Sequence, residues 1–298
     1  MGFFLEVLLG GLMAGVLYSL VALGLVLIFK ASGVFNFAQG AMVLFAALSL
    51  VRLMEKMPLP LALLVTCVIM LALAYAIERL VLRPLVNQPG ISLFMATLGI
   101  TFFLEGFGQI LWGSDIYKLD LGIPKQPVII LENVFKGGIL VGSDDLFATV
   151  VSGALVIVLA IFFQKTRIGR ALRAVADDHQ AAQSIGIPLN QIWLIVWTVA
   201  GLVALVAGVI WGSRLGVQFS LSLIALKVLP VVILGGFTSV PGAIVGGLII
   251  GVGEKLSEVY LGPVIGGGIE NWFAYTVALA FLLVRPEGLF GEKLIDRV

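Results

Sequence analysis

The feature that most constrains the fold of this chain is its succession of long apolar runs separated by short polar breaks. A helix needs about 20 mostly apolar residues to cross the hydrocarbon core of a bilayer. Runs near that length, some shorter, cover residues 3–29, 34–54, 59–80, 91–112, 146–164, 191–212, 221–235, 243–260 and 270–284. The sequence therefore predicts an all-α, polytopic membrane protein with about eight to ten transmembrane segments, some of them short or broken.

Composition and charge exclude several other classes of protein. Of the 298 residues, 60% are hydrophobic and only 12% are charged, whereas a soluble domain carries about 25% charged residues. The net charge is +1, so nothing predicts a nucleic-acid partner. The single Cys67 excludes an intrachain disulfide, and the single His179 cannot build a metal site alone. We therefore expect no catalytic residue, no metal and no cofactor in this chain.

The distribution of Lys and Arg predicts the orientation in the membrane, because cytoplasmic loops carry an excess of both. If the charged segment 165–190 is cytoplasmic, ten of these residues fall inside and seven outside. This assignment places the C-terminus in the cytoplasm and the segment 113–145 outside. That external loop contains the β-prone run Pro-Val-Ile-Ile-Leu, so we expect some extended structure in it. Residues 1–298 are expected to form one transmembrane domain.

The segment 165–190 is a charged island between two apolar runs. Good helix formers dominate from about Arg170 to Ser184, so one short helix is predicted there, with Asp177 and Asp178 in its middle. Gly186 fits the left-handed position that ends a helix, and Pro188 follows it. Two interpretations remain open: a helix that docks a soluble partner, or a loop whose arginines reach to lipid phosphates.

Four motifs together resemble a known family. The sequence Ala181-Ala182-x-x-x-Gly186-Ile187 is similar to the coupling-helix signature of ABC importer permeases. Three further motifs resemble the branched-chain amino-acid permeases and their urea and sugar relatives. They are Asn36-Phe37-Ala38-Gln39-Gly40, then Glu78-Arg79 with Arg83-Pro84-Leu85, and finally Gly235-Gly236 through Ser239, Pro241-Gly242-Ala243 and Gly246-Gly247. Gln39 departs from the pattern, since many relatives carry histidine there, and it counts against a mechanism that needs an ionisable group at this position.

The resemblance implies a multi-subunit importer in a bacterial inner membrane. An extracytoplasmic binding protein would deliver the substrate, and a second, related permease, favoured over a second copy, would complete the path. Separate ATPase subunits would bind ATP and Mg, since this chain has no Gly-x-x-x-x-Gly-Lys-Ser/Thr sequence to cradle phosphates. The residues expected to couple to the ATPase are Arg170, Arg173, Asp177, Ala181, Ala182, Gly186 and Ile187.

The segment Asn36-Phe37-Ala38-Gln39-Gly40 places two amides at the mouth of an apolar run. An unpaired polar group there costs several kcal/mol, so both amides need partners. Broken helices expose backbone groups that can hold a substrate, which makes Asn36, Gln39 and Gly40 candidates for the substrate path. The alternative is a tight turn in which Asn36 caps the following helix.

Three charged residues, Glu105, Lys227 and Glu254, lie within or near apolar runs. Charges inside a bilayer are costly and are usually paired or functional. We expect Glu105 and Lys227 in the outer half of the membrane, where they pair or line an outer vestibule of the substrate path. The alternative is that each reaches to the outer headgroups.

Glycines recur at helical spacing near the C-terminal end. Overlapping small-x-x-x-small patterns, which let helix backbones approach closely in lipid, are formed by Gly242, Gly246, Gly247 and Gly251. Close helix packing is one interpretation, and a moving or subunit-facing interface is the other. Gly11 and Gly15 repeat the pattern more weakly.

The function that these features favour is a permease subunit that moves a small polar solute, above all branched-chain or other amino acids. The alternative is a secondary transporter or channel that works alone. Such a protein needs buried ionisable groups along an ion path, of which this chain offers few, and has no use for a docking loop.

Overall fold

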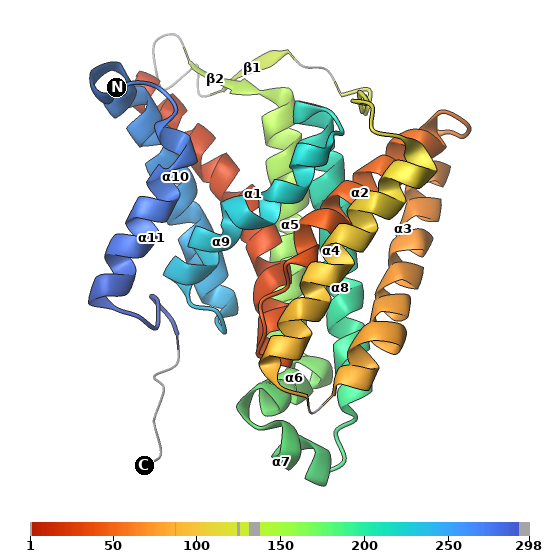
Figure 1. Cartoon of the computed structure of the whole chain (residues 1–298). Coiled ribbons are helices and arrows are strands. Elements are labelled where there is room, and N and C mark those ends of the chain that lie inside the picture. Colours follow the sequence, from red (N-terminus) through yellow and green to blue (C-terminus); the bar gives the residue numbers. More distant parts are fainter. Residues whose placement is uncertain (1, 87, 124–125, 131–137, 292–298) are drawn as a thin grey trace. The chain divides into compact units, whose positions relative to one another are not determined.

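The computed structural model of this chain describes residues 2–86, 88–123, 126–130 and 138–291. Helices dominate these residues, and Figure 1 shows them in sequence colours. The long helices are α1 (Gly2–Ser32), α2 (Ala38–Met54), α3 (Leu59–Ala76), α4 (Gly90–Trp112), α5 (Ser143–Lys165), α8 (Leu189–Leu215), α9 (Ile224–Gly235), α10 (Val240–Ile265) and α11 (Phe273–Val284). Each predicted apolar run thus corresponds to one helix in the described part of the chain.

Shorter elements join these helices. A π-helix, η1 (Ile77–Leu82), and a 3₁₀ turn, η2 (Arg83–Leu85), continue α3. Two more 3₁₀ turns precede α9 and α11, namely η3 (Phe219–Leu223) and η4 (Ile269–Asn271). The charged segment forms α6 (Arg167–Asp177) and α7 (His179–Ser184).

Six of the described helices are long and apolar enough to cross a membrane: α1, α3 extended to Leu85, α4, α5, α8 and α10. Three apolar segments are shorter: Ala38–Met54, Phe219–Gly235 and Phe273–Val284. The chain is therefore a polytopic helical membrane protein, as predicted. That the three shorter segments also cross remains a prediction.

The segment 113–145 contains the expected extended structure. Strand β1 (Pro127–Ile130) pairs antiparallel with β2 (Ile139–Gly142), with Pro127 opposite Gly142. Residues 131–137 lie outside the described residues, and the external location of this loop stays a prediction.

The helices divide into two compact units. Unit one comprises Met1–Leu23, Gly122–Val158 and Lys227–Val298, and unit two comprises Gly24–Leu121 and Leu159–Leu226. Each is described by itself, and the expectation of a single domain over 1–298 stays a prediction.

Helix α2 is the centre of unit two. Its residues are buried from Ala38 to Val51, and it packs against α8, α4, α3 and η3 (Figure 1). A helix that is apolar on every side lies in a protein core or in a bilayer, and α2 lies in a core because its residues are buried by the neighbouring segments. Unit two therefore holds the segment Asn36–Gly40, from which α2 starts, inside its own core.

In unit one, α10 contacts α1 and α9 through different glycines. A Cβ atom on Gly251 would lie 2.5 Å from Gly15 Cα, and one on Gly247 would lie 2.8 Å from Gly15 O. A Cβ on Gly246 would lie 2.7 Å from Val231 O, and Gly242 meets Gly235 even more closely. The four candidate glycines thus lie at two interfaces, where the backbones approach too closely for a side chain.

Candidate functional site

The charged segment does not form the single helix predicted for it. Asp178 is extended (φ −159°, ψ 114°) and separates α6 from α7. Its carboxylate accepts a hydrogen bond from Ala181 N at 3.0 Å, and its carbonyl accepts one from Ala182 N at 2.9 Å. A short acidic side chain favours this capping geometry over a mid-helix position. The prediction that placed Asp177 and Asp178 in the middle of one helix was therefore wrong, since Asp177 is the last residue of α6 and Asp178 follows it.

The alanine–glycine signature forms a tight helix stop. Gly186 has a φ of +86°. Ile187 N donates to Ala182 O at 3.0 Å, and Gly186 N donates to Gln183 O at 3.0 Å. This pair of bonds is a Schellman motif, in which the residue after the glycine also contacts the last turn. The spacing from Ala182 to Ile187 thus has a structural basis.

Helix α6 is held against the end of α5 by a capped turn. Thr166 Oγ1 accepts a hydrogen bond from Gly169 N at 3.2 Å. Arg173 Nη1 donates to Phe163 O at 2.8 Å, so this arginine binds the last carbonyls of α5. A side chain on Gly169 would collide with the Phe163 carbonyl. The sequence reading missed both Thr166 and Gly169, although a threonine three residues before a glycine amide is a recognisable cap.

The remaining candidate coupling residues form an exposed tip. Arg170, Asp177, Ala181 and Gly186 are exposed, while Ala182 is buried. The apolar stripe of α6 is covered by protein, since Leu172 is 2% and Val175 0% exposed. Both α6 and α7 contact α8. The loop therefore presents a mixed surface of charged and polar residues together with Ile185, which is 74% exposed, while the apolar stripe of α6 is covered by the protein.

The two candidate amides are buried and hydrogen-bonded. Asn36 Oδ1 accepts from the backbone N of Ala38, the first residue of α2, at 3.1 Å, while the N-cap residue Phe37 makes no side-chain capping bond. Asn36 Nδ2 donates to Gln39 Oε1 at 3.4 Å, and Gln39 Nε2 donates to Ala200 O of α8 at 3.2 Å. Both residues are 0% exposed. Gly40 meets the Ser222 carbonyl of η3 so closely that no Cβ could fit. Asn36 thus stabilises the turn that leads into α2, and the substrate path stays a prediction.

The two candidate charges lie in different units. Glu105 is half-buried on α4 of unit two. Lys227 starts the part of α9 that belongs to unit one, and its Nζ lies 5.8 Å from the centre of the Tyr18 ring. Their pairing therefore stays a prediction.

A buried polar pair that the sequence reading missed lies in unit one. The Tyr18 hydroxyl on α1 donates to Glu254 Oε2 on α10 at 2.7 Å. Glu254 is 3% exposed, and its Oε1 has no hydrogen-bond partner among the described residues. Glu254 was visible as an intramembrane charge, but no sequence signal connects it to a tyrosine 236 positions away.

No group of three or more His, Cys, Asp or Glu that could hold a metal ion occurs among the residues that the structure describes. The site therefore consists of the docking-type loop and the buried amides, both in unit two.

Comparisons with known proteins cover nearly the whole chain. The family model described as "Branched-chain amino acid transport system / permease component" matches residues 7–285. The protein named "High-affinity branched-chain amino acid transport system permease protein LivH" of Salmonella typhimurium is 28% identical, over 99% of this chain and 98% of that protein. The "Probable branched-chain amino acid transport permease protein LivH" of Methanocaldococcus jannaschii is 31% identical, over 96% and 92%. A chain of the structure "PsaBC from Streptococcus pneumoniae in complex with Fab" covers 93% of this chain and 90% of its own, with 14% identity and a TM-score of 0.46.

Proposed function

Because this chain belongs to the family of permease components of branched-chain amino acid transport systems, it is a membrane transport subunit, and we propose that it forms part of the path of an ATP-driven ABC importer. The proposed substrates are branched-chain or other small amino acids. The proposed partners are ABC ATPase subunits that bind ATP and Mg, a second, related permease, and an extracytoplasmic binding protein. The proposed location is the bacterial inner membrane, with the C-terminus in the cytoplasm.

The observation that carries this proposal is the architecture of the charged loop. A helix that anchors to lipid must leave its apolar stripe open to the membrane, yet Leu172 and Val175 are buried by the protein. What the loop exposes is a set of charged and polar residues and the apolar Ile185 around a helix stop fixed by the left-handed Gly186. A surface of this kind suits a protein partner better than a lipid one.

Movement of the ATPase can be transmitted from the charged loop to Asn36 and Gln39 through unit two alone. Movement of a docked ATPase would push α7 and α6, and both contact α8. Helix α8 packs on α2 and holds Gln39 through the Ala200 carbonyl. A shift of α8 would therefore strain or break this bond at the entry of α2. The amides of Asn36 and Gln39 would then be released to a polar substrate, and Glu105 and Lys227 are proposed further along the path.

The test compares three glycine variants in the tagged chain, purified with its partners from membranes of the native host. Gly186→Arg places a bulky charge on the exposed tip, and recovery of ATPase subunits is expected to fall about tenfold or more. Gly186→Asn tolerates the left-handed backbone without a charge and is expected to recover them.

Gly122→Arg is the matched control. Gly122 is also exposed and has a φ of +69°, and a Cβ on it would meet no atom within 4 Å, but it lies in the segment 113–145. The variant introduces the same charge and a similar backbone strain away from the loop. Full recovery of ATPase subunits with both Gly186→Arg and Gly122→Arg would contradict the docking role. Equal losses in both variants would show a general folding defect and would also refute a specific role for the tip.

A further inference from the structure

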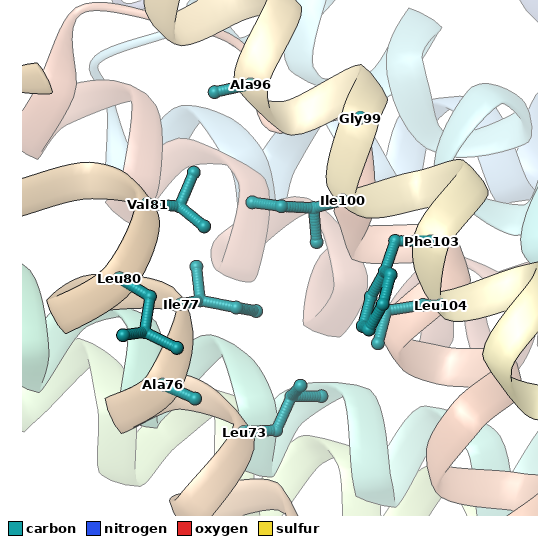
Figure 2. A pocket seen from close by; sticks show the side chains of 10 residues that line it. All are labelled: Leu73, Ala76, Ile77, Leu80, Val81, Ala96, Gly99, Ile100, Phe103 and Leu104. Carbon is teal, nitrogen blue, oxygen red and sulfur yellow. The ribbon is translucent and has the colours of Figure 1, made fainter.

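A wholly apolar groove lies between two helical segments of unit two, apart from the loop and the amides. Its volume is about 460 Å³, within the range of about 300–1,000 Å³ typical of ligand pockets. Leu73, Ile77, Leu80 and Val81 line one side, and Ile100 and Phe103 of α4 line the other. Figure 2 shows the lining side chains on both sides of the hollow, all of them carbon only. A polar solute would find no hydrogen-bond partner among them.

Two backbone features leave this space open. The segment Ile77–Leu82 is a π-helix, whose wider turn lets the neighbouring side chains Leu80 and Val81 both reach the groove. On the facing helix, Gly99 contributes no side chain, and a Cβ there would meet no atom within 4 Å. The groove is therefore a real gap that a larger residue at position 99 would fill without clashing.

The helices that form the groove are, with α5, the least covered of the six long apolar helices that the structure describes. Only 28% of the apolar window of α3 and 22% of that of α4 is buried, against 72% for α1 and 67% for α8. In a membrane protein such faces meet acyl chains. An apolar occupant that reaches the groove from the bilayer is thus a lipid chain.

Two basic residues are close in the sequence to the groove-lining residues Leu80 and Val81. Arg79 and Arg83 are exposed and lie directly before and after Leu80–Leu82, whereas Glu78 on the same turn is only 4% exposed. With the Asn190 amide turned so that its oxygen faces Arg83, Arg83 Nε and Nη2 both donate to that oxygen at 3.1 Å. Arg79 Nη1 donates to the Tyr75 hydroxyl at 3.2 Å. A guanidinium has five donors, so each arginine keeps capacity for a phosphate.

We propose that this groove binds an acyl chain of an anionic phospholipid, with Arg79 and Arg83 contacting its phosphate. The apolar lining selects the chain, and the two arginines favour a negatively charged headgroup over a zwitterionic one. The site would link the end of α3 to the start of α8 through the Arg83–Asn190 contact.

The test counts bound phospholipids by native mass spectrometry of the complex extracted from membranes. Gly99→Leu fills the groove and is expected to lose one bound phospholipid. Gly106→Leu is the matched control on the same helix, because Gly106 also has open space around a Cβ but does not line the groove. Equal lipid numbers in the two variants would overturn the proposal.

A second measurement tests the proposal even if the Gly99→Leu variant fails to insert into the membrane. Purified complex is titrated with phosphatidylglycerol or phosphatidylcholine in detergent, and binding is followed by thermal shift. Each of Arg79→Gln and Arg83→Gln is expected to weaken phosphatidylglycerol binding about fivefold, with little change for phosphatidylcholine. Unchanged phosphatidylglycerol affinity in the double variant would refute the headgroup contact. Disulfide cross-linking of Gly99→Cys to another subunit, with no loss of lipid, would show a protein occupant instead.

Discussion

The effect of the close packing of α1 on α10 on the free energy of unfolding can be measured with two glycine-to-alanine variants on α1. A Cβ on Gly15 would lie 2.8 Å from Gly247 O and 2.8 Å from Leu248 Cα. Both are backbone atoms and cannot rotate away, so the helices must separate by about 0.6 Å to restore an ordinary contact of 3.4 Å. A Cβ on Gly10 would meet nothing within 4 Å.

Replacing glycine by alanine inside a helix is favourable by about 0.8–1.0 kcal/mol. Gly10→Ala should therefore raise the free energy of unfolding by up to about 1 kcal/mol. In Gly15→Ala the same gain is opposed by an overpacking cost of about 1–3 kcal/mol, so the net change is about 0–2 kcal/mol of destabilisation. The difference between the variants isolates the packing cost, because the intrinsic helix propensity cancels.

The assay is thermal unfolding of the purified protein in one detergent. In domains of about 150–250 residues each kcal/mol shifts Tm by about 2–4 °C, so the two variants should differ clearly, with Gly15→Ala lower. Equal Tm values would refute the close approach of the two backbones.

Three further variants test other contacts. Tyr18→Phe removes the only hydrogen bond that the described residues give the Glu254 carboxylate, so unfolding should become about 1–3 kcal/mol easier; an unchanged Tm in detergent would exclude this bond as a stabilising one. Ser152→Ala removes a buried hydroxyl with no hydrogen-bond partner among the described residues, so Tm should stay the same or rise, and a clear fall would show an unseen partner. Gly169→Ala forces α6 away from the Phe163 carbonyl, so limited trypsin digestion near Lys165 should accelerate; digestion at the wild-type rate would contradict the tight turn.

The helices were predictable from the sequence because the bilayer leaves few alternatives. Every backbone polar group in lipid must be satisfied inside its own segment, so an apolar run of sufficient length has to be helical. The break between α9 and α10 was also visible, since Gly236 has a φ of +103° and Ser239 caps α10 through Gly242 N. Helix ends depend on the residue types at a few neighbouring positions, such as glycine and serine, and these can be read from the sequence.

The architecture of the charged loop was predictable only in part. Gly186 followed from a local rule, but the break at Asp178 depended on whether its carboxylate caps a new helix or faces solvent, and composition does not decide this. Arg173 looked like a docking residue because it is charged, yet it binds the Phe163 carbonyl ten positions earlier. That contact exists only because Gly169 lets α6 approach α5, which no periodic pattern reveals.

The buried contacts between distant segments could not be predicted from the sequence. Gln39 donates to a carbonyl on a helix 161 positions away. The acceptor is the backbone carbonyl of residue 200, and every residue type carries the same carbonyl, so the sequence at this position does not indicate the bond. The groove between η1 and α4 likewise depends on a π-helix, which hydropathy does not distinguish from an α-helix.

The central claim is that this subunit works in an importer powered by ATP, and its most direct test is uptake into proteoliposomes. The complex purified through the tagged chain is reconstituted with ATP enclosed on the ATPase side, and uptake of radiolabelled leucine is followed with the binding protein outside. The account predicts uptake that requires ATP hydrolysis, persists when ionophores collapse the ion gradients, and is lost with Gly186→Arg. Uptake by the chain alone, without ATP and abolished by ionophores, would contradict it and indicate a secondary transporter.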